Sequence, residues 1–226
     1  MKTENIDKLV ASKKQFLEYV AVCNRNFRSI TPSIYLYRKI FEKQETVNYQ
    51  VEKLIKDQEF LELVYVTLVS WNMNMRGARM ADFNSFADSI QGFSQKIAKL
   101  SGMELNLLSE SEIEHTLELT KLLFLGLKVM KSKSKIVGVS KTLHFLLPKL
   151  FPPMDRRYTM NFFYGHFNYH DDVNKEYKSV SNLLREFYRI SQKLNLTSKD
   201  VDKVLWNTTV PKLIDNAIIG FVSGKS

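Results

Sequence analysis

The chain has 226 residues, of which 44% are hydrophobic, and it carries a net charge of +9 with one cysteine, Cys23. This composition indicates a globular protein with its own core and excludes a largely disordered chain. A single cysteine excludes an internal disulfide and a four-cysteine metal or iron–sulfur site. We therefore expect a reducing, cytoplasmic location and no cofactor.

The N-terminal residues lack the apolar region of a signal peptide. The longest mostly apolar stretch, 122–130, is interrupted by Lys128 and is too short to span a bilayer. No membrane partner is expected.

Apolar residues recur at three- and four-residue spacing along the chain, which predicts helices. In chain order the expected helices cover 6–21, 32–41, 50–71, 82–100, 109–130, 140–147, 156–164, 172–194, 198–206 and 211–222. Ser109 and Glu112 have the spacing of a capping box, and Pro32 follows Thr31 as a first helical residue follows its cap. We predict an all-α fold, a compact array of about ten helices. It forms either one helical domain over 1–226 or two lobes divided near 101–110.

Positive charge is concentrated in residues 121–157, which hold nine lysines and arginines and one acid, Asp155. This segment therefore carries +8 of the net +9. Such a local excess is typical of a protein that binds a polyanion, and DNA is the partner we expect. The alternative is a solvated lysine-rich linker, Lys128 to Lys135, without a partner.

Residues 138–142 resemble part of a nucleotide-binding P-loop. The motif needs a glycine directly before its lysine, where this chain has Ser140, and a first glycine where it has Lys135. Without those glycines the backbone amides cannot wrap a phosphate, so nucleotide hydrolysis is excluded.

His166 and His170 are four residues apart, the spacing that two zinc ligands have on one helix face. Phe167 stands where that motif has its catalytic glutamate. We expect a surface turn here and no metal site.

Residues 71–80 combine Trp71, Arg76 and Arg79 with two asparagines and three methionines, between two expected helices. This mixture could grip a flipped base or a phosphate, which makes the three residues candidate pocket residues. The alternative is that the tryptophan and methionines fill the core while the arginines pair with acids.

Residues 131–163 read as a basic run, an apolar pair, Gly138, Ser140–Lys141, an amphipathic helix, a proline-rich turn and Asp155 before another helix. This order resembles the helix-hairpin-helix core of the base-excision DNA glycosylase superfamily. The resemblance implies a helix-hairpin-helix-like element near residues 121–147 with Gly138 in the hairpin. The family usually has glycines four and two residues before the lysine, where this chain has Val137 and Val139.

The resemblance also implies roles for single residues. Lys141 would be an amine nucleophile, and Asp155 would cap its helix and assist chemistry at the sugar. The residues expected to contact DNA are Lys131, Lys133, Lys135, Gly138, Ser140, Arg156 and Arg157. We expect a helix N-terminus, the neighbouring Lys133 and Lys135, and removal from water to lower the pKa of Lys141.

Three functions remain open: a glycosylase-like repair enzyme, a DNA-binding protein without catalysis, and a protein-interaction module whose basic surface meets an acidic partner. In the second and third, Lys141 is a solvated helix lysine and Asp155 only an N-cap. The combination of 71–86 with 140–159 also resembles an uncharacterised prokaryotic family.

Overall fold

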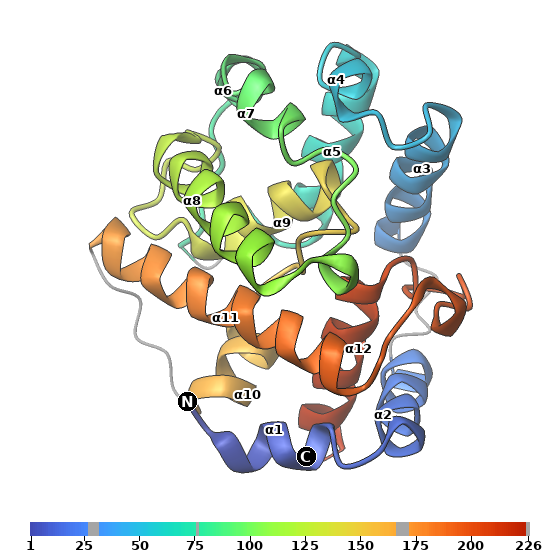
Figure 1. The fold of residues 1–226 in the computed structure, drawn as a ribbon. Coiled ribbons are helices and arrows are strands. Elements are labelled where there is room, and N and C mark those ends of the chain that lie inside the picture. The colour runs from blue at the N-terminus through green and yellow to red at the C-terminus, as the bar shows by residue number, and fades with distance from the viewer. Residues whose placement is uncertain (27–31, 76, 166–171, 225–226) are drawn as a thin grey trace.

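The computed structural model describes residues 1–26, 32–75, 77–165 and 172–224, and these residues form an all-α fold (Figure 1). The α-helices are α1 (Thr3–Leu9), α2 (Lys13–Asn26), α3 (Pro32–Thr46), α4 (Val51–Leu54), α5 (Gln58–Ser70), α6 (Phe83–Gly92), α7 (Ser94–Ala98), α8 (Glu110–Gly126), α9 (Ile136–Leu146), α10 (Asn161–Tyr164), α11 (Val173–Lys193) and α12 (Val210–Ser223). Short 3-10 turns are η1 (Leu105–Leu107) and η3 (Ser198–Asp200), and η2 (Arg156–Met160) is a π-helical turn. The predicted fold class is confirmed. No helix in the described ranges is both long and apolar enough to cross a membrane.

Side-chain caps explain where several helices begin. Ser109 Oγ accepts a hydrogen bond from the backbone N–H of Glu112, whose carboxylate accepts one from the N–H of Ser109, so the predicted capping box at α8 is confirmed. Asp172 caps α11, where its carboxylate accepts hydrogen bonds from the backbone N–H groups of Asn174 and Lys175. Pro32 is the first residue of α3, as predicted, while Thr31 lies outside the described residues.

The helix predicted over 198–206 is wrong, because only η3 is helical there. Asp202 Oδ1 accepts hydrogen bonds from the backbone N–H of Val204 and the side-chain amide of Asn207, both at 2.9 Å. Such a local side-chain bond offers the backbone an alternative to the helix. Lys203 and Leu205 accordingly have φ of 56° and 52°.

The helix α12 is buried almost throughout, and it packs closely against α2 (Figure 1). Gly220 permits this approach, since a Cβ atom at that position would lie 1.9 Å from the carbonyl oxygen of Tyr19. Buried apolar residues from Leu9 to Phe221, several of them on α12, join in one continuous core. Three polar residues of α12, Lys212, Asp215 and Asn216, are buried with the rest of the helix.

Residues 127–135 connect α8 to α9 and pair with the segment after Trp71. Met80 and Met130 form an isolated antiparallel bridge, and the backbone N–H of Lys131 donates to the carbonyl of Arg79 at 2.7 Å. Gly138 is the third residue of α9, where a Cβ atom would lie 2.4 Å from the side chain of Met130. The prediction that Gly138 turns a hairpin is wrong, because α9 begins at Ile136. The described residues do not show a helix-hairpin-helix element near 121–147.

Candidate functional site

A cavity of about 340 Å³ lies where α2, α9 and α12 meet the residues that follow α5. Its walls carry two lysines, two aspartates and two tryptophans: Lys141, Lys212, Asp155, Asp215, Trp71 and Trp206. Charged groups beside flat aromatic surfaces are suited to a planar polar ligand. Three of these six residues, Lys141, Asp155 and Trp71, are site candidates from the sequence.

The chain brings Lys141 and Asp155 to one cavity through a link between α9 and the segment before η2. Ser140 is buried, and its Oγ accepts a hydrogen bond from the backbone N–H of Met154 at 3.2 Å. One oxygen of Asp155 then accepts from the N–H of Tyr158 at 2.7 Å, so the predicted N-cap role of Asp155 is confirmed. Ser140 holds this arrangement from inside, and the prediction that it contacts DNA is wrong.

The amine of Lys141 lies 5.2 Å from the ring centroid of Trp71. Within the described part of the chain it forms no ion pair. Burial lowers the pKa of Lys141, opposed by the charges of Asp155 and Asp215 and assisted by that of Lys212. The direction agrees with the sequence prediction, and so does one of the three expected causes, removal from water. Lys141 lies in the middle of α9 rather than at its N-terminus, and its removal from water is the largest effect.

The α12 side of the cavity holds a polar cluster that the sequence reasoning missed. Lys212 Nζ donates to Asp215 Oδ2 at 2.6 Å and to the side-chain oxygen of Asn216, whose amide donates to Asn207 at 2.7 Å. The side chains of Lys212 and Asp215 are only 6% and 4% exposed. Burial raises the pKa of Asp215 to about 6, against the opposing effect of Lys212. A lysine, an acid and an amide at i, i+3 and i+4 of an otherwise apolar helix was the available signal.

A buried series of hydrogen bonds through Tyr37 and His144 supports the two tryptophans of the cavity wall. Tyr37 stacks on Trp71 with centroids 5.6 Å apart and packs on Trp206 at 5.1 Å. Its hydroxyl lies 3.1 Å from His144 Nε2 and 2.7 Å from Thr208 Oγ1. His144 Nδ1 lies 2.7 Å from the carbonyl of Phe151, which can only accept, so Nδ1 carries the proton and Nε2 accepts from Tyr37. Burial lowers the pKa of His144 to about 3, which keeps the ring neutral.

Arg79, one of the two arginines predicted beside Trp71, does not share its position. Arg79 is exposed, and its guanidinium donates to the carbonyls of Ala78 and Asn74. It is not among the residues that line the cavity. Arg76 lies outside the described residues.

The basic candidates lie on the surface around this core. Lys131 and Lys133 are exposed, and the amine of Lys131 lies 3.3 Å from Asp82. Lys135 is half-buried, and its backbone N–H donates to Glu176 at 2.9 Å. None of the three, and not Gly138 either, lines the cavity, and burial of Gly138 removes it from any DNA contact.

Arg156 and Arg157 are exposed and directly follow Asp155. The guanidinium of Arg157 lies 5.2 Å from the ring centroid of Tyr158, a residue of the cavity wall. These two arginines are therefore the predicted DNA-contacting residues nearest to Asp155 in the chain.

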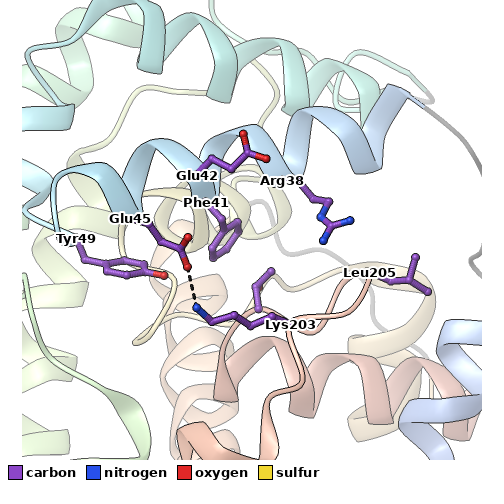
Figure 2. Close-up of a pocket in the computed structure, with 8 residues that line it drawn as sticks. Arg38, Phe41, Glu42, Glu45, Tyr49, Lys203 and Leu205 are labelled. Carbon is purple, nitrogen blue, oxygen red and sulfur yellow. Dashed lines mark hydrogen bonds and ion pairs between the residues drawn. The ribbon is translucent and has the colours of Figure 1, made fainter.

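A second, smaller cavity of about 130 Å³ lies between α3 and the segment after η3 (Figure 2). Glu45 and Lys203 pair across it at 2.9 Å, with Arg38 and Glu42 beside them. This cavity is smaller and the Glu45–Lys203 ion pair already crosses it, so it is the weaker candidate site.

No group of three histidine, cysteine or carboxylate side chains in the described ranges is arranged to hold a metal. His166 and His170 lie outside those ranges.

Comparison with known proteins gives no match, whether to family models, curated proteins or solved structures.

Proposed function

We propose that this chain binds DNA and takes one extruded nucleotide into the larger cavity, where Lys141 acts as the amine nucleophile of a glycosylase/AP lyase-like enzyme. The observation that carries the proposal is that Lys141 and Asp155, separated by 14 positions in the sequence, line one cavity with tryptophan walls. An amine is nucleophilic only when neutral, and burial of Lys141 favours that form.

The chemistry can be written for an abasic deoxyribose in its open aldehyde form. The amine lone pair of Lys141 attacks the aldehyde carbon, and the two amine hydrogens leave with the carbonyl oxygen as water. The product is an imine, a Schiff base between the lysine and C1′. On an intact nucleotide the same amine displaces the base, which leaves with the bonding electrons and takes up the proton that the attacking nitrogen loses. The C1′–O4′ bond of the resulting aminal then opens, a proton moves from nitrogen to O4′, and the same imine forms. Loss of a C2′ proton to water from this imine expels the 3′-phosphate, which cleaves the strand.

The neighbouring residues have separate tasks in this proposal. The carboxylate of Asp155 stabilises positive charge at the sugar. It can do so because Asp155 lines the cavity and only one of its two oxygens accepts the hydrogen bond of the helix cap. Trp71 and Trp206 offer stacking surfaces that offset the cost of unpairing a base, a few kcal/mol. Arg156 and Arg157, with Lys131, Lys133 and Lys135, supply phosphate contacts.

A screen against duplexes that carry single damaged bases or an abasic site, run at two salt concentrations, tests this function. We expect binding that weakens as salt rises and strand cleavage at one lesion that is lost in Lys141→Gln. Binding without cleavage of any lesion would leave a DNA-binding protein without catalysis. Absence of binding at low salt would contradict the proposal and favour a basic surface that meets an acidic protein.

A further inference from the structure

The Lys212–Asp215 pair has no part in the chemistry above, although both side chains line the same cavity as Lys141. A buried ion pair is weak evidence for stability, because apolar residues of similar volume often stabilise a fold as well or better. Most of α12 around the pair is apolar. A role in the cavity explains better than stability why two charges are kept on this helix.

The two lysines of the cavity differ in their ion-pair partners. The amine of Lys212 is held by Asp215 and Asn216, whereas Lys141 forms no ion pair among the described residues. Lys212 is therefore committed to the pair, and Lys141 is left available for reaction. The charges of the pair still act on Lys141 across the cavity.

We propose that Asp215 is a second functional carboxylate of this cavity, a positioning residue that, together with Lys212, sets the protonation state of the Lys141 amine. This inference rests on the proposed function, because it concerns the same nucleophile. Asp215 acts through Lys141 and is not itself proposed to touch the sugar.

Most of the other titratable groups around Lys141 are neutral near pH 7 and exert no charge on its amine. Burial raises the pKa of Cys23 to about 12 and that of Tyr37 well above its usual range, so both are neutral near pH 7. His144 is neutral as well. The charges left to act on Lys141 are those of Asp155, Asp215 and Lys212, and only the carboxylates favour its protonated form.

The negative charge of Asp215 should have a measurable effect on the pKa of Lys141. Removing the negative charge of Asp215 takes away one interaction that favours the ammonium form, so the pKa of Lys141 falls. More of the amine is then neutral at pH 7, and it reacts faster with any electrophile. A purely structural role for Asp215 has no such effect on the pKa.

Trace labelling with acetic anhydride, read for each lysine by peptide mass spectrometry over a range of pH, measures this pKa without DNA. In Asp215→Asn we expect Lys141 to label roughly three- to tenfold faster at pH 7, a fall of half to one pKa unit. The matched control is Asp202→Asn. Asp202 accepts a hydrogen bond from Asn207, which in turn accepts one from Asn216, so this change weakens the same hydrogen-bond network at a residue that does not line the cavity. It should leave the Lys141 rate unchanged.

Equal acceleration in both variants would mean that loosening exposes Lys141, and no acceleration in Asp215→Asn would mean that the carboxylate does not act on it. Either result overturns the inference. If Asp215→Asn does not fold, the wild-type profile decides. Ionisation of Asp215 near pH 6 should retard the rise in Lys141 labelling, and a single-step profile counts against the inference.

The labelling separates this inference from the proposed function. Labelling that responds to Asp215, without any reaction on DNA, supports the inference and ends the proposed function. Reaction on DNA, together with Lys141 labelling that is unchanged in Asp215→Asn, supports the proposed function and ends the inference.

Discussion

His144 is a buried titratable side chain whose effect on stability has a definite sign. Its pKa in the folded protein is about 3, below the usual value of about 6.5, so the unfolded chain binds a proton that the folded chain does not. The stabilisation is present above pH 6.5 and is lost as the pH falls toward 3. Between pH 7 and pH 5 this amounts to about 2 kcal/mol in the free energy of unfolding.

Urea unfolding of wild type and His144→Gln at the two pH values checks this. The wild type should lose about 2 kcal/mol more than the variant between pH 7 and pH 5. Asp215 acts with the opposite sign, because its raised pKa favours folding at low pH, but it is present in both proteins and cancels. Equal losses in the two proteins would mean that His144 is not held neutral.

Asp155 has two roles that substitution can separate. Asp155→Ala removes both the helix cap and the charge and should cost about 0.5–2 kcal/mol of stability. Asp155→Asn keeps a capping oxygen and should cost much less, while it removes the charge from the cavity. If the charge assists the reaction, both variants lose cleavage activity although only the first loses stability. Full activity in Asp155→Asn would reduce Asp155 to a cap.

At the scale of elements, the contact between α2 and α12 depends on Gly220. Gly220→Ala places a Cβ atom against the backbone of Tyr19, so we expect a loss of about 1–3 kcal/mol or more. The control is Gly92→Ala at the end of α6, where no atom lies within 4 Å of the added carbon. That change should be neutral or stabilise by about 0.4–1 kcal/mol. Thermal unfolding of both variants measures these changes in stability. A Gly220→Ala protein as stable as wild type would contradict the close contact between α2 and α12.

The elements that were predictable from sequence are those whose cause is local. The capping box at Ser109 and the cap at Asp172 are short-range hydrogen bonds between residues three apart or closer, and both helices start as predicted. The segment after η3 was missed because its apolar spacing suggests a helix, while the hydrogen bonds of Asp202 favour a turn. The family resemblance placed Gly138 in a turn, whereas its small size serves a contact with Met130 inside α9.

The candidate site was predictable only in part. The sequence resemblance selected Lys141 and Asp155, but it could not show that Trp206, Lys212 and Asp215 would join them, since those residues follow more than 50 positions later. Their convergence is set by the burial of α12 against α2, which is a property of the whole fold.

At the scale of the molecule, the surface charge predicts how DNA binding responds to salt. Neutralising Lys131, Lys133 and Lys135 together should reduce the slope of log affinity against log salt by about 2–3 units if each contacts one phosphate. The control replaces three exposed lysines elsewhere, Lys53, Lys56 and Lys99, and should change the slope less. An unchanged slope in the Lys131, Lys133 and Lys135 variant would place the DNA surface elsewhere.

The central claim is that the Lys141 amine in the tryptophan-walled cavity attacks the deoxyribose. Borohydride trapping on a duplex with an abasic site or a damaged base is its most direct test, because hydride reduces the imine to a stable protein–DNA cross-link. We predict a cross-linked species with wild type that maps to Lys141 and is absent in Lys141→Gln, measured beside a stability control. A cross-link of equal yield in Lys141→Gln, or none with wild type on any lesion, would contradict the claim.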